Sequence, residues 1–212
     1  HSENLTFGQR ISLQYTISWL QRNEPEKQEL IRTFMERKLA MSEEAEHHES
    51  VYINSSTLVK WYHNNAPQEQ DRLREYLQKA LKSSKYLDEK KYRAIALGNM
   101  RIWIKRNDPS AIDELKQLML EEMEIHRQSV DYISQSHMSQ EIINWYEEHE
   151  PTNLDERWNL IKSQMELGSK IAAEEDSDGR NMRISLRSAA RFHLEFPEYQ
   201  SFSIEPKYLE FP

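Results

Sequence analysis

The segment Trp103-Ile-Lys-Arg-Asn107-Asp-Pro109 is one of four copies that decide the fold of this chain. Each copy runs from a Trp to a Pro six residues later, and successive copies lie 42 residues apart without a gap. The other copies are Trp19-Leu-Gln-Arg-Asn23-Glu-Pro25, Trp61-Tyr-His-Asn-Asn65-Ala-Pro67 and Trp145-Tyr-Glu-Glu-His149-Glu-Pro151. Because the chain holds only five Trp and seven Pro, this shared register predicts an internal repeat.

Apolar residues flank each Trp-to-Pro segment at helical spacing. Positions eight and two before the Trp and one after it are mostly apolar, and in the second copy they hold Ile53, Val59 and Tyr62. Positions six, nine, ten and fourteen after the Pro are apolar again, and in the second copy they hold Leu73, Tyr76, Leu77 and Leu81. This spacing predicts an amphipathic helix on each side, the second of about 20 residues.

The Trp-to-Pro segment is therefore expected to be the tight turn of a helical hairpin. We place the Pro in the first turn of the second helix, where its missing N–H costs nothing. We expect that helix to be capped by the Asn before the Pro or by the acidic residue after the Asn. The Asn residues in question are Asn23, Asn65 and Asn107.

One hairpin cannot bury its apolar face alone, so successive hairpins are expected to stack. Over roughly residues 9–175 the chain resembles the HEAT and tetratricopeptide class of helical repeats, on the basis of this period and hairpin pattern. The resemblance implies an all-α protein whose hairpins form an α-solenoid, and it transfers no functional residue. A closed helical bundle is the alternative packing.

We predict a single domain over residues 1–212. Its repeats are expected at about 9–50, 51–92, 93–134 and 135–176. After a polar break, residues 180–195 predict one further helix that caps the stack, and the tail at 196–212 loses helical periodicity. We expect this aromatic tail to pack along the last hairpins.

Composition narrows the range of partners. Asp and Glu exceed Lys and Arg by 36 to 28, which gives a formal net charge of −8 and argues against a nucleic-acid partner. The acidic field favours a basic protein or peptide partner. No apolar run approaches the roughly 20 residues of a membrane span, so no membrane insertion is expected. The absence of Cys excludes thiolate chemistry and leaves the compartment open, with the cytoplasm slightly favoured.

Residues that recur in every repeat are expected to be structural, as we expect for the Trp, so function is sought where the repeats differ. The last predicted helix carries four Arg at helical spacing, namely Arg180, Arg183, Arg187 and Arg191. Such a stripe suits a phosphate, a carboxylate ligand or an acidic partner. Alternatively, it pairs with acids of the preceding helix, among them Glu156, Glu166 and Glu174.

Tyrosines are the second group of candidates. Seven are expected to be exposed at positions outside the repeat pattern, namely Tyr15, Tyr52, Tyr62, Tyr86, Tyr92, Tyr132 and Tyr146. Tyr with Arg is typical of peptide-binding grooves, so Tyr62 and Tyr146 are predicted partner contacts. Tyrosines of this kind are equally typical of a hairpin core.

Histidine and glutamate pairs at i,i+4 spacing are weak metal-site candidates. His47 and His48 each follow a Glu by four residues, and His126 follows Glu122 in the same way. Solvated histidines at helix ends are the simpler interpretation, and no metal or cofactor is expected.

The sequence thus predicts a non-enzymatic interaction module that binds a protein or peptide partner. It holds four Gly and none of the common nucleophile, phosphate-loop or dinucleotide motifs. The alternatives are a sensor domain that holds a small molecule between helices and a metal-dependent helical enzyme. The oligomeric state is left open.

Overall fold

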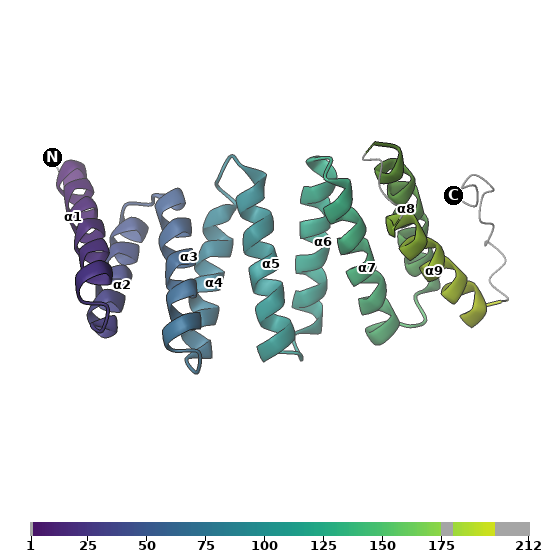
Figure 1. Cartoon of the computed structure of the whole chain (residues 1–212), viewed down its shortest axis with the longest axis horizontal. Helices are drawn as coiled ribbons and strands as arrows, with labels where there is room; N and C mark the ends of the chain where they lie inside the picture. Colours follow the sequence, from purple (N-terminus) through teal and green to yellow (C-terminus); the bar gives the residue numbers. More distant parts are fainter. Residues whose placement is uncertain (1, 175–179, 198–212) are drawn as a thin grey trace. The chain divides into compact units, whose positions relative to one another are not determined.

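The computed structural model describes residues 2–174 and 180–197, and every regular element in these residues is an α-helix (Figure 1). The all-α prediction is therefore confirmed for this part of the chain. The chain divides into two compact units, residues 1–109 and 110–212, and the boundary falls within the third predicted repeat. The prediction of one domain over residues 1–212 stays a prediction.

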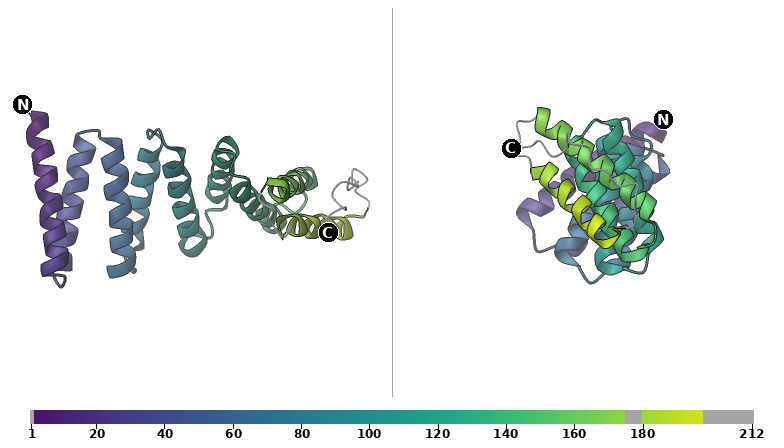
Figure 2. Two further views of the ribbon diagram at one scale, coloured as in Figure 1. Left: turned by 45° about the horizontal axis from the view of Figure 1, so that its top comes forward. Right: turned by 90° about the vertical axis from the view of Figure 1, so that its right-hand side faces the viewer.

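The first unit consists of two complete hairpins and one further helix. Its helices are α1 (Ser2–Asn23), α2 (Gln28–Glu44), α3 (His48–Asn65), α4 (Gln70–Ser84) and α5 (Lys90–Asn107). Each packs mainly on its neighbour in the chain, α1 on α2, α2 on α3, α3 on α4 and α4 on α5 (Figure 1, and the left view of Figure 2). Its fully buried side chains include those of Leu58, Leu97 and Ile104.

In the second unit, too, consecutive helices pack on one another. Its helices are α6 (Ile112–Gln128), α7 (Tyr132–His149), α8 (Leu154–Glu174) and α9 (Arg180–Glu195), and α7 and α8 each pack on both chain neighbours. Among the described helices of either unit, the substantial interfaces all join consecutive helices, which is the packing of a helical repeat and not of a closed bundle. No helix in the described residues is long and apolar enough to cross a membrane.

Helix boundaries agree closely with the repeat register. Each predicted hairpin contains two helices, and α9 confirms the predicted further helix at 180–195. The predicted tail at 196–212 lies almost entirely outside the described residues. The recurring acid four positions after each Pro lies in the first turn of a second helix, where the helix dipole favours it.

The Pro does not lie where the sequence placed it. The second helices begin three residues after the Pro, at Gln28, Gln70, Ile112 and Leu154. Pro25 instead occupies the second position of a β-turn, which the Lys27 N–H closes by donating to the Glu24 carbonyl at 3.0 Å. The fixed φ of Pro suits that position, so the turn uses Pro before the helix begins.

The predicted role of the Asn residues is also wrong. The second helices α2, α4 and α6 begin without a side-chain cap. The Asn amides point back to the preceding helix, where Nδ2 of Asn65 donates to the Trp61 carbonyl at 2.9 Å and Asn107 does the same to Trp103 at 3.0 Å. Each amide thus adds a hydrogen bond to a carbonyl in the last turns of the first helix.

The buried Trp of the second hairpin is held by the second helix of the hairpin before it. The indole Nε1–H of Trp61 donates to Oε1 of Gln28 at 3.0 Å, and the Arg32 guanidinium lies 5.7 Å from the ring centroid. Nε2 of Gln28 donates in turn to the Pro25 carbonyl at 2.5 Å. A hydrogen bond and a cation–π contact thus join consecutive hairpins at one place.

Trp103 on α5 repeats this arrangement 42 residues later. Its Nε1–H donates to Oε1 of Gln70 at 2.9 Å, and the Arg74 guanidinium lies 5.1 Å from the ring centroid. Nη1 of Arg74 also donates to Oδ2 of Asp108, 2.9 Å away in the following turn. We call this set of contacts the tryptophan link.

The second unit keeps only part of the tryptophan link. Lys116 lies 4.5 Å from the Trp145 ring centroid and pairs with Glu150 at 2.7 Å. Ile112 stands in the position of Gln28 and Gln70, and its side chain cannot accept a hydrogen bond. The buried Nε1 of Trp145 accordingly has no acceptor among the described residues.

Trp19 has no preceding hairpin in the described chain and is 53% exposed, whereas Trp61, Trp103 and Trp145 are 6%, 7% and 4% exposed. The three buried rings confirm that the Trp residues that recur in the repeats are structural. The exposed ring shows that burial comes from the neighbouring hairpin and not from the Trp-to-Pro segment itself.

Truncating the linked Trp should destabilise the protein strongly. Trp61→Ala and Trp103→Ala are each expected to lower the free energy of unfolding by about 3–5 kcal/mol, because each removes a buried aromatic ring. Trp19→Ala should cost at most about 1 kcal/mol, since its ring is half exposed. Urea unfolding of the three variants checks this order, and equal small losses would contradict a structural role for the Trp.

Ile112→Gln should stabilise the second unit by giving the Trp145 indole an acceptor. A net gain of about 0.5–1.5 kcal/mol is expected, the usual contribution of one hydrogen bond. Urea unfolding measures the change, with Ile112→Leu as a control that offers no acceptor. A gain that persists when Trp145 is also changed to Phe would show that the indole N–H is not its cause.

Candidate functional site

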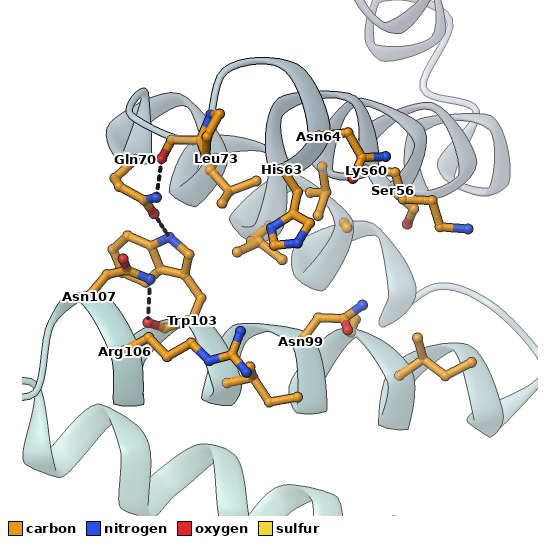
Figure 3. A pocket seen from close by; sticks show the side chains of 17 residues that line it. Ser56, Lys60, His63, Asn64, Gln70, Leu73, Asn99, Trp103, Arg106 and Asn107 are labelled. Carbon is orange, nitrogen blue, oxygen red and sulfur yellow. Dashed lines mark hydrogen bonds between the residues drawn. The ribbon is translucent and has the colours of Figure 1, made fainter.

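A groove of about 600 Å³ lies between α3 and α5 in the first unit, with α4 at its base (Figure 3). Leu73, Leu77 and Ala80 of α4 supply much of its apolar lining, and Trp103 of α5 forms part of one wall. The tryptophan link fixes this wall, because Gln70 holds the indole at 2.9 Å. The volume falls within the usual range of ligand pockets.

Basic and carboxamide side chains border the groove. Lys60 and His63 come from α3 and Arg106 comes from α5, and the amides of Asn64 and Asn99 stand beside them. Figure 3 shows His63, Asn99 and Arg106 projecting into the same space from opposite walls. No Asp or Glu lines the groove within the described residues, although acids outnumber bases in the chain. The groove is thus a local exception to the acidic surface.

The first hairpin has no open groove of this kind, and the two hairpins differ at one position of the second helix. In the groove the position holds Ala80, and 42 residues earlier it holds Lys38. Nζ of Lys38 donates to Oε1 of Gln14 at 2.5 Å. The space along α1 and α3 is divided into two smaller pockets of about 280 and 220 Å³, and Lys38 lines the smaller one.

In the second unit the equivalent space is bridged by polar contacts. Gln164 stands 84 residues after Ala80, and its Nε2 donates to Oε1 of Gln140 on α7 at 3.1 Å. The same oxygen accepts a hydrogen bond from Ser188 Oγ of α9 at 3.0 Å. These contacts join α7, α8 and α9 where the first unit leaves a groove.

Arg157 of α8 is a residue whose importance sequence reasoning missed. Its side chain is fully buried, and Nη2 lies 3.2 Å from Oε1 of Glu147 and 3.3 Å from Oε2 of Glu195. The guanidinium also lies 5.3 Å from the Phe192 ring centroid. The available signal was an Arg at a position that is apolar in the other repeats, where Leu73 stands in the second. Arg157 thus joins three helices through charge.

The predicted arginine stripe lies on α9. Arg183, Arg187 and Arg191 are exposed, and the side chain of Arg180 lies outside the described residues. Nη2 of Arg191 pairs with Oε2 of Glu147 on α7 at 2.5 Å, so one member of the stripe faces an acid of its own unit. That acid is not among the three that the sequence suggested. Anion binding by the stripe stays a prediction.

The expected exposure of the tyrosines is wrong for three of them. Tyr52, Tyr62 and Tyr146 are buried, whereas Tyr15 and Tyr86 are 73% and 61% exposed. The Tyr62 hydroxyl donates to Oε1 of Glu36 at 2.8 Å, and the Tyr76 hydroxyl donates to the same oxygen at 2.9 Å. Tyr146 packs edge-on against Trp145, with ring centroids 5.3 Å apart. Tyr62 and Tyr146 thus serve the hairpin core, and the groove lining includes neither.

The four metal-site candidates have local roles. Nδ1 of His47 accepts the Ser50 N–H at 3.2 Å and so caps α3, and His48 stacks on Tyr86 with ring centroids 4.1 Å apart. In the second unit, Nε2 of His126 lies 3.8 Å from Oε1 of Glu122 on the same helix. The described residues hold no group of three His, Cys, Asp or Glu side chains arranged to bind a metal.

No protein-family model matches this sequence, and the sequence of no curated protein matches it either. Among solved structures, the chain is similar to the crystal structure of BtubC (BKLC) from P. vanneervenii. The two share 13% sequence identity at a TM-score of 0.46, over 91% of this chain and 83% of the other. A similarity of this size says nothing about function.

Tyr62 should make the stability of the first unit sensitive to alkaline pH. Burial, and secondarily the Glu36 carboxylate, raise the pKa of Tyr62 from 10.0 to about 12. A folded-state pKa above the unfolded value means that the neutral phenol contributes stability below pH 10, and that this contribution is lost as the pH rises from 10 to 12. The free energy of unfolding should therefore fall over this interval.

Urea unfolding over that interval, together with phenolate absorbance, measures the effect. The fall should be smaller in Tyr62→Phe, and the tyrosine absorbance change centred near pH 12 should shrink. Tyr15→Phe is the matched control, because its ring is exposed and it should leave both unchanged. The same pH dependence in wild type and Tyr62→Phe would refute the assignment.

Proposed function

We propose that this chain is a non-enzymatic helical-repeat interaction module that binds an acidic peptide segment of a protein partner in the groove between α3 and α5. The supporting observation is the lining of that groove, which combines an apolar base with basic and carboxamide side chains and contains no acid among the described residues. Both the shape and the charge of the site suit a peptide with an acidic and an apolar residue close together.

Two cations favour a carboxylate in the groove. Lys60 and Arg106 stand on opposite walls, and a guanidinium forms paired hydrogen bonds to a carboxylate. Asn64 and Asn99 add neutral N–H donors that help to orient the acid without adding charge. His63 adds positive charge when it is protonated. A cluster of donors without a competing acid thus selects an anionic group.

The apolar base of the groove favours a side chain near that acid. Leu73, Leu77 and Ala80 present hydrocarbon to the open space. Burying one Leu-sized side chain there contributes about 1.5–3 kcal/mol. Such a contribution supplements the charge pair, which by itself is weak at an exposed site.

The positive charge of the groove favours an acidic partner, whereas the net charge of the chain favours a basic one. The overall charge of −8 favours a basic partner, but contact chemistry depends on the side chains that line the site. The arginine stripe on α9 is the second acid-binding candidate. It is less well developed, because Arg191 already pairs with Glu147.

Peptide selection tests the proposal directly. A displayed library of random 12-residue peptides, selected on the intact chain, should yield sequences with an acidic residue close to an apolar one. Fluorescence anisotropy of one labelled peptide should then show about 10- to 100-fold weaker binding to Lys60→Ala with Arg106→Ala, because two charged contacts are lost. Added salt should weaken binding to the wild type.

The control variant removes the same charges elsewhere in the first unit. Arg37→Ala with Lys82→Ala changes one Arg and one Lys that do not line the groove, and should bind as the wild type does. Equal weakening of peptide binding in both double variants would show that the effect comes from the net charge of the chain and not from contacts in the groove. Selection of neutral or basic peptides, or of none, would overturn the proposal. Equally tight binding of small free carboxylates would favour a small-molecule site.

A further inference from the structure

A second pocket adjoins the groove on the other side of Lys60 and Asn64 of α3. It measures about 280 Å³, and Lys60 and Asn64 line both it and the groove. The two spaces therefore meet at one pair of side chains on α3. A ligand in the groove that passes over this pair enters the second pocket, which α1, α2 and α3 surround.

Carboxamides dominate the second pocket. Half of its lining residues are Asn or Gln, and the amides of Gln28 and Asn65 are engaged in the tryptophan link and the adjoining turn. The exposed amides of Gln21 and Asn64 form no hydrogen bond with any other described residue. No acid lines this pocket within the described residues, and Lys60 is its single cation there. The pocket thus offers neutral hydrogen-bonding groups.

We infer that the peptide bound in the groove continues as an extended chain across Lys60 and Asn64 into the second pocket. There Gln21 and Asn64 hydrogen-bond its main chain. This inference rests on the proposed function. A carboxamide has one acceptor oxygen and two N–H donors, which match the N–H and C=O of a peptide group. The second pocket therefore recognises the main chain of the peptide, while the groove binds its acidic and apolar side chains.

The path has a defined end. Beyond the second pocket lies the 220 Å³ pocket, which shares Gln21, Met35 and Thr57 with it. Lys38 lines that last pocket and is tied to Gln14 at 2.5 Å. The burial of Lys38 and the nearby Arg10 lower its pKa. We place the end of the bound peptide before Lys38.

The repeat geometry sets the length of the ligand. Packed helices lie about 8–10 Å apart, so a path over two successive hairpins covers roughly 20 Å. An extended peptide advances about 3.3 Å per residue. About six residues are therefore needed to contact both spaces, and a shorter peptide reaches the groove alone.

A length series of the selected 12-residue peptide tests this inference. Gln21→Ala should weaken binding of the full peptide by about 3- to 10-fold, the loss of one neutral hydrogen bond. It should leave unchanged a four-residue peptide that holds only the acidic and apolar residues. Gln9→Ala, on the same helix and away from both pockets, is the matched control. Main-chain N-methylation outside the four-residue core should weaken binding to the wild type more than binding to Gln21→Ala, which retains only the Asn64 contact.

The possible outcomes separate this inference from the proposed function. Peptide binding that depends on Lys60 and Arg106 but ignores Gln21, peptide length and N-methylation would overturn the extended path and leave the groove intact. Equal weakening of short and long peptides by Gln21→Ala would also overturn it, because the short peptide does not reach that residue. Failure of every peptide to bind would overturn both.

Discussion

The contact between each buried Trp and the second helix of the preceding hairpin is the constraint on which the rest of the fold depends. In the first unit a carboxamide receives the indole N–H and a cation lies over the ring, as Gln28 and Arg32 do for Trp61, whereas Trp145 keeps only the cation. The contact fixes where one hairpin meets the next, so the turn, the helix lengths and the 42-residue period must all be kept. The exposed ring of Trp19 shows the same segment without that neighbour.

Much of this fold was predictable because the repeat supplies four independent readings of each position. The helical structure, the number of helices and the structural role of the Trp follow from positions at which the four repeats hold similar residues. The errors arose at residues that suit two different local structures equally well. Asn65 ends one helix shortly before the next begins and is able to hydrogen-bond to either, and Pro67 suits a β-turn as well as a first helical turn. Only the three-dimensional path of the turn decides between them.

The candidate site was not predictable in the same way. Its opening depends on Ala80, an unremarkable residue in sequence, and its significance appears only beside Lys38 and Gln164 in the equivalent places. The predicted tyrosines are buried because a Tyr on a helix gives no sign of whether its hydroxyl meets solvent or a carboxylate such as Glu36. The repeats do differ at the candidate site, but the differences lie in small residues and amides and not in the charged and aromatic residues that the sequence singled out.

The position held by Ala80 has a consequence for how such a protein changes over time. It lies apart from the tryptophan link and packs with Tyr52 and Ala96, so a substitution there alters the space between hairpins and leaves the tryptophan link in place. A single residue at this position therefore changes whether a hairpin carries an open groove, while the fold persists. Lys38, Ala80 and Gln164 are three of the residues that hold this position, and they show that the space between helices can change along the chain without a new architecture.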